Sequence, residues 1–179
     1  MTNRGGQAAG VGGNELARGP AAAIAAPLQL YAATVGPEWV DYNNHLSEWA
    51  YLLIFGDNAD ALFRFIGIDE AYRASGKSLY TAETHLRHLR EVKLGQRLTL
   101  TVTVLGHDAK RLHLVHEMLI HGAGCVATAE QMLLHVDAVA GRVAPFGPDV
   151  AGRLQLIATA HASLPRPEHA CGYLRIRER

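Results

Sequence analysis

The stretch DYNNHLS, residues Asp41 to Ser47, stands directly before a long segment with an apolar stripe, Glu48 to Ile66. Apolar side chains recur in this segment at the three- and four-residue spacings of one helix face, and Gly67 is a residue type that commonly ends a helix. The apolar positions are Leu52, Phe55, Ala59, Leu62, Phe63 and Ile66. The spacing predicts a helix over 48–66 that starts beside a carboxylate, two amides and an imidazole.

The start of this predicted helix is suited to carbonyl chemistry. The first turn of a helix presents unpaired backbone N–H groups and a partial positive charge, which stabilise an oxyanion. The backbone N–H groups of Ser47 and Glu48 are the expected donors, and Asp41 is the expected general base or nucleophile. A loop Asp that caps the helix or completes a turn is the alternative.

The remaining polar residues of the stretch have alternative roles. His45 either holds the substrate carbonyl or water, orients Asp41, or fixes the loop through hydrogen bonds. Asn43 and Asn44 are typical loop formers, and Asn44 or Ser47 could cap the helix. The choice depends on which groups surround the loop.

Length and composition exclude several classes of protein. A chain of 179 residues suits one domain with a real core. With 17 basic and 17 acidic side chains it lacks the charge excess of a nucleic-acid binder. The apolar run 21–26 is too short to span a membrane, and two cysteines are too few for a disulfide framework. We therefore expect a cytoplasmic protein with a disordered Gly- and Ala-rich tail over 1–27.

The rest of the chain alternates strand patterns with turn signals. Leu98, Leu100 and Val102 alternate with threonines, which is the strongest strand signal. The predicted strands are Leu28 to Val35, Leu79 to Arg90, Leu98 to Val104, Leu112 to Ile120 and Val126 to Asp137. We expect a short helical turn at 69–76, a helix at 150–162 and a weakly ordered tail at 165–179.

This order predicts an α+β fold. Short connections make the later strands antiparallel neighbours, and the one long helix must cover the concave face of their sheet. We expect a domain over 28–150, in which about five antiparallel strands wrap around the central helix, and a C-terminal helix and tail over 151–179.

The order of elements and the Asp41 stretch resemble the hotdog fold, in particular the 4-hydroxybenzoyl-CoA-thioesterase-like acyl-CoA thioesterases. The resemblance rests on Asp41, Asn44, His45, Leu46, Ser47 and Tyr51, and on the phrase LREVKLG at 89–95. Asn44 stands where this family often has Gly, and Ser47 where it often has Asn. The resemblance implies hydrolysis of an acyl-CoA thioester without a cofactor, in a homodimer or homotetramer.

Further phrases are similar to the betainyl-CoA thioesterases of carnitine degradation. They are WVDYN at 39–43, SLYT at 78–81 and DAKRLH at 108–113. A trimethylammonium acyl group is held by aromatic rings, and the expected cage is Trp39, Tyr42 and Tyr80 with Glu83 as the countercharge. Asn44 is a further expected substrate contact. Arg90 and Lys93, which flank the turn resembling the family's, are the expected ligands of coenzyme A phosphates.

A metal site is not expected. His85 and His88 are three residues apart in a predicted strand, as are His113 and His116, so each pair points to opposite faces of its sheet. The spacing of a zinc site is absent from the sequence.

Two other functions fit parts of the pattern. A hotdog enoyl-CoA hydratase also uses an Asp and a His near a helix start, but there the His usually follows the Asp by five residues with Pro between. Here His45 follows Asp41 by four. A non-catalytic acyl-CoA-binding module would not need a carboxylate aimed at the carbonyl. Hydrolysis is therefore the preferred reading.

Overall fold

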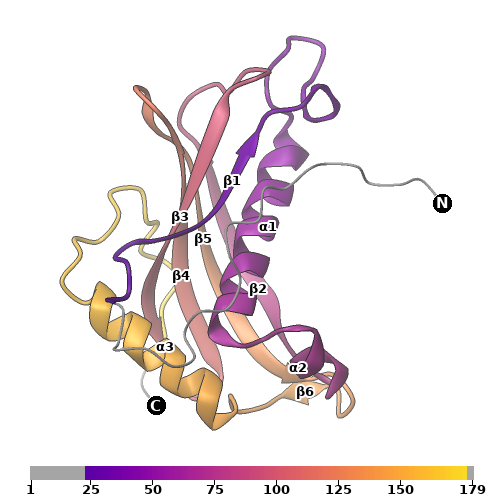
Figure 1. The fold of residues 1–179 in the computed structure, drawn as a ribbon, viewed down its shortest axis with the longest axis vertical. Coiled ribbons are helices and arrows are strands. Elements are labelled where there is room, and N and C mark those ends of the chain that lie inside the picture. The colour runs from indigo at the N-terminus through magenta and orange to yellow at the C-terminus, as the bar shows by residue number, and fades with distance from the viewer. Residues whose placement is uncertain (1–22, 177–179) are drawn as a thin grey trace.

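A computed structural model describes residues 23–176 of the chain (Figure 1), and residues 1–22 and 177–179, including most of the predicted N-terminal tail, lie outside the described part. In chain order the elements are β1 (Leu28–Thr34), η1 (Pro37–Trp39), α1 (Glu48–Ile66), α2 (Glu70–Ala74), β2 (Lys77–His88), β3 (Arg97–His107), β4 (Arg111–Ile120), β5 (Gly124–Asp137), β6 (Arg142–Val143) and α3 (Pro148–His161).

The strands form one antiparallel sheet that curls around α1 (Figure 1). Its order is β1-β3-β4-β5-β2, and the two-residue β6 pairs with β5. The predicted α+β hotdog architecture is confirmed, although the strand at 126–137 is not the last. Strand β2 is an edge, because the described strands pair with it only through β5.

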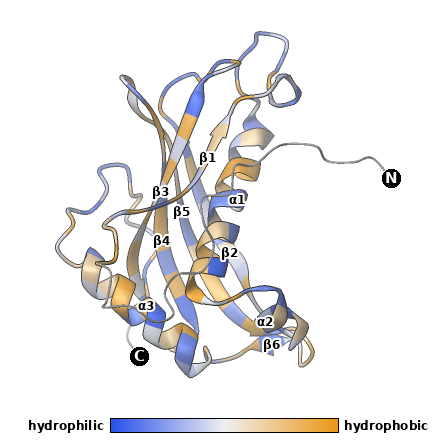
Figure 2. Cartoon of the chain, in the orientation of Figure 1, coloured by the Kyte–Doolittle hydropathy of each residue, from blue (hydrophilic) through white to orange (hydrophobic). Residues whose placement is uncertain are grey.

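Helix α1 has the predicted bounds. Ile54, Phe55 and Leu62 are fully buried against the sheet, and Gly67 ends the helix at φ 95°, a left-handed geometry that glycine adopts without strain. Ser47 is the residue at the N-cap, but its side chain makes no capping hydrogen bond. Figure 2 shows apolar and polar segments alternating along the helices and strands, as a two-faced layer requires.

Helix α1 lies on the concave face of the sheet as predicted, and helix α3 shares this face with it. Val150, Leu154 and Ile157 of α3 join the core cluster that contains Leu62 and Ile66 of α1. His161 extends the contact, because its Nδ1 accepts from the Val104 N–H at 2.9 Å. The lower half of the sheet is thereby covered by a second helix (Figure 1).

A buried polar network joins the middle of α1 to the sheet. Asn58 donates to Nδ1 of His116 at 2.9 Å and to the Thr101 carbonyl at 3.3 Å. Nε2 of His116 then carries the proton and donates to Gln131 Oε1 at 3.1 Å. Burial lowers the pKa of His116 to about 4. The network fixes the position of α1 along β4 and β5.

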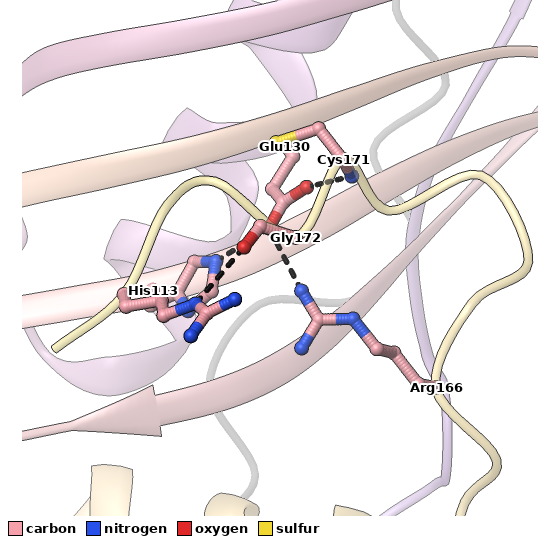
Figure 3. A network of polar contacts seen from close by, with 6 residues as sticks. His113, Glu130, Arg166, Cys171 and Gly172 are labelled. Carbon is pink, nitrogen blue, oxygen red and sulfur yellow. Dashed lines mark hydrogen bonds and ion pairs between the residues drawn. The ribbon is translucent and has the colours of Figure 1, made fainter.

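The C-terminal segment is ordered against the outer face of the sheet, where a weakly ordered tail was expected (Figure 3). The carboxylate of Glu130, only 1% exposed, accepts from His113, from Arg166 and from the Cys171 N–H. Leu174 is 4% exposed. A buried charge is costly unless it is paired, and the segment supplies two of the three donors that Glu130 requires.

Candidate active site

The residues from Asp41 to His45 form a closed turn in front of α1. The Asp41 N–H donates to the His45 carbonyl at 2.8 Å, and the Asn44 N–H donates to the Asp41 carbonyl at 3.0 Å. Asn44 has φ 59°, the left-handed conformation that Asn tolerates better than most residues. This explains how Asn can stand where the resembling family often has Gly.

The carboxylate of Asp41 is held by the same turn. Its Oδ1 accepts from the Asn43 N–H at 2.8 Å and from the His45 N–H at 3.1 Å. Turn formation and catalysis are therefore compatible, because the two N–H groups engage one oxygen and orient the group. Among the described residues, no hydrogen bond engages Oδ2.

The backbone donors at the start of α1 differ in part from those expected. The Ser47 N–H donates to the Trp39 carbonyl at 2.8 Å and is occupied. The Ala50 N–H turns back to the Ser47 carbonyl at 2.9 Å. No hydrogen bond joins the Glu48 or Trp49 N–H to another described residue. The free pair at this helix start is thus Glu48 and Trp49.

The turn is joined to the connection between β2 and β3. The Leu46 N–H donates to the Val92 carbonyl at 2.7 Å, and His45 pairs with Lys93 in an antiparallel bridge. His45 Nε2 lies 3.3 Å from a carboxylate oxygen of Glu91. These partners lie far apart in the sequence, and for this reason the sequence alone did not identify Glu91.

A shallow, open depression of about 490 Å³ lies beside the turn, and we call it the Tyr51 pocket. The Tyr51 ring packs edge-on against His88 with centroids 4.5 Å apart. Burial, followed by the nearby Glu91 charge, raises the pKa of Tyr51. The lining residues are His45, Leu46, Glu48, Tyr51, His88, Leu89, Arg90 and Glu91. His88, like Glu91, was missed, because its place beside α1 follows from the curl of the sheet.

The structure does not bring the expected aromatic cage together within one chain. Trp39 is partly buried against the core below the turn, whereas Tyr42 is 94% exposed. Tyr80 and Glu83 are exposed on β2. Tyr80 precedes His88 by eight residues of that strand, a separation of roughly 26 Å at about 3.3 Å per residue. Any contact of Tyr80 with the site therefore requires a second chain.

The two expected coenzyme A ligands lie at the connection between β2 and β3. Arg90 donates to the Ala123 carbonyl at 2.7 Å, which directs its guanidinium to the β4–β5 turn. Lys93 is exposed, and its backbone N–H donates to Gln96 Oε1 at 2.7 Å. Both side chains lie on the outside of the molecule near the Tyr51 pocket.

Within residues 23–176, no three His, Cys, Asp or Glu side chains gather in a way that could hold a metal ion. No helix in that range is long and apolar enough to cross a bilayer. His113 and His116 do point to opposite faces, toward Glu130 and Asn58 respectively.

Residues 35–154 match the model of the Thioesterase-like superfamily, and the chain belongs to this family. A betainyl-CoA thioesterase from Pseudomonas aeruginosa is 49% identical over 143 residues, which cover 79% of this chain and 90% of that protein. An L-carnitine dehydrogenase/betainyl-CoA thioesterase from Rhizobium meliloti is also 49% identical over 147 residues, 80% of this chain. The matched part spans only 29% of that longer relative.

Solved structures share the architecture. A candidate thioesterase from Pseudomonas putida has a TM-score of 0.73 and 38% identity, covering 85% of this chain and 98% of that one. A Staphylococcus aureus protein solved in complex with CoA has the same TM-score at 23% identity, covering 86% and 98%. The second likeness concerns the fold alone. Together they agree with the predicted resemblance to hotdog thioesterases.

Proposed function

We propose that the protein is an acyl-CoA thioesterase that releases coenzyme A and a free acid, with betainyl-CoA as the preferred substrate. One observation carries the proposal: a closed turn directly before α1 orients the Asp41 carboxylate, and the first two N–H groups of α1 have no hydrogen-bond partner among the described residues. The names of the relatives support the substrate. Unpaired cysteines and a coenzyme A thioester are consistent with a reduced, cytoplasmic setting.

The proposed reaction uses the turn and the helix start together. The thioester oxygen accepts hydrogen bonds from the Glu48 and Trp49 N–H groups, which stabilise the charge that develops there. Asp41 either removes a proton from a water molecule that attacks the carbonyl carbon, or attacks this carbon itself. With water as the nucleophile, the C–S bond breaks and the leaving thiolate takes the proton from Asp41, which leaves the free acid. With Asp41 as the nucleophile, loss of the thiolate leaves a mixed anhydride on Asp41, and water hydrolyses this anhydride to the free acid and the Asp41 carboxylate. His45 positions the turn through its backbone N–H and its contact with Glu91.

The proposed functional unit is an oligomer that forms through β2. Strand β2 has 12 residues, and one of its sides has no partner strand within residues 23–176. An open edge of this length is normally paired or covered. Antiparallel pairing of two β2 strands would carry the partner's first half of β2 toward this chain's His88. The expected roles of Tyr80 and Glu83 depend on that pairing. Arg90 and Lys93 remain the proposed phosphate ligands.

The test is thiol release from a panel of acyl-CoA substrates that includes betainyl-CoA. We expect release of free coenzyme A that persists after treatment with a chelator. Release that disappears with the chelator and returns with zinc would contradict the metal-free reaction. No release from any member of the panel would reject the proposed function.

A further inference from the structure

Two carboxylates and the ring of Tyr51 line the Tyr51 pocket. Glu48 and Glu91 are both exposed, whereas Tyr51 is 5% exposed. Among the described lining residues, Arg90 is the only Lys or Arg, and its guanidinium donates to the Ala123 carbonyl. The two carboxylates and the one guanidinium of the lining sum to a formal charge of −1.

We propose that Glu91 and Glu48, with the ring of Tyr51, bind the positive head group of the acyl chain and so select a cationic acyl-CoA. The inference rests on the proposed function and adds the residues that choose the acyl group. A negative pocket with an aromatic face suits a quaternary ammonium ion, which has no N–H to donate and is held by charge and cation–π contact.

The shortness of the betainyl group places its cation near the reacting carbon. One methylene separates the nitrogen from the thioester carbonyl, so the two atoms are about 2.5 Å apart. The groups that hold the cation must then adjoin those that hold the carbonyl oxygen. Glu48 does both, since its N–H is a free donor and its side chain lines the pocket. Glu91 contacts His45 of the turn at 3.3 Å.

Within one chain, the aromatic cage expected from the sequence does not bring its side chains this close to the reacting carbon. Tyr42 is 94% exposed, and Tyr80 lies roughly 26 Å along β2 from His88. A partner's β2 remains the rival source of an aromatic and acidic subsite, through its Tyr80 and Glu83. The experiment therefore includes variants of the Tyr51 pocket and a variant of β2.

The experiment compares two substrates of equal shape. Betainyl-CoA and 3,3-dimethylbutanoyl-CoA differ in the central atom of the head group, nitrogen or carbon, and so in charge. The readout is the ratio of kcat/KM for the cationic substrate to that for the neutral one, because a general loss of activity cancels in this ratio. The variants are Glu91→Gln, Glu48→Gln and Glu83→Gln, with Glu70→Gln in α2 as the matched control.

We expect Glu91→Gln and Glu48→Gln each to lower the ratio by at least about tenfold, an effect between the water and protein-surface limits for two charges about 4 Å apart. The control should leave the ratio unchanged. A ratio that stays within about twofold in both variants overturns the proposal, as does a fall confined to Glu83→Gln. If the unaltered protein cleaves only the neutral substrate, this inference fails and thioester hydrolysis stands. If it cleaves neither, both fail.

Discussion

At the scale of single residues, the turn before α1 is closed by Asp41 and Asn44. Asn44 adopts φ 59°, and Asp41 closes the turn through both its backbone and its carboxylate. Asp41 therefore has two roles: its carboxylate completes the turn, and the turn in return orients that carboxylate. Ser47 stands where the resembling family often has Asn. Its backbone N–H donates a hydrogen bond to the Trp39 carbonyl.

Substitution of Asn44 tests whether the geometry of the turn controls activity. We expect Asn44→Gly to retain stability and turnover, because glycine accepts a positive φ without strain. Asn44→Val should cost about 1–3 kcal/mol of stability and lower kcat/KM, since a β-branched residue is strained there. Thermal melting and thiol release measure both effects. Equal behaviour of the two variants would show that the left-handed conformation is not required.

At the scale of elements, α1 is located by the buried network of Asn58, His116 and Gln131. The apolar spacing was sufficient to predict the bounds of α1 and the faces of the strands, because these follow from local periodicity. The network could not be predicted, since Asn58 and His116 are 58 residues apart and meet only when the sheet curls. The contact between Glu91 and His45 could not be predicted for the same reason.

The low pKa of His116 predicts a loss of stability in mild acid. Its pKa falls from 6.5 to about 4 in the folded state, so the unfolded chain binds the extra proton between these values. Stability is full above pH 6.5 and declines as the pH falls toward 4, by on the order of 3 kcal/mol. Burial also lowers the pKa of His161, which acts in the same direction.

Denaturant unfolding at pH 7 and pH 5 measures this decline. Both values lie above the ordinary pKa of Glu130 and Asp108, whose lowered values affect stability only in stronger acid. We expect a lower free energy of unfolding at pH 5, and a smaller pH dependence in His116→Gln. An unfolding free energy that is equal at the two pH values would contradict the neutral, buried state of His116.

At the scale of the whole molecule, the described residues form one sheet, two concave-face helices and an outer C-terminal segment, and they leave one edge of β2 without a partner strand. The α+β class and the curled sheet could be predicted from the order of elements. The docking of residues 165–176 could not, because few apolar residues mark that segment and its anchor, Glu130, lies on β5.

The open edge predicts an oligomer under working conditions. We expect sedimentation velocity to give a dimer or tetramer at the concentrations used for thiol release, because pairing of β2 edges satisfies their free backbone groups. A monomer with full activity would contradict this expectation. It would also remove Tyr80 and Glu83 from the site, since their distance from His88 within one chain is roughly 26 Å.

The most direct test of the central claim is the rate of thiol release by Asp41→Asn. The amide is nearly isosteric and its oxygen can still accept the Asn43 and His45 N–H groups, so we expect an unchanged melting temperature. It cannot act as a base or carboxylate nucleophile, so kcat/KM should fall at least about a hundredfold. Asp60→Asn, at an exposed position of α1, is the matched control. Near-normal turnover by Asp41→Asn with an unchanged melting curve would contradict the account.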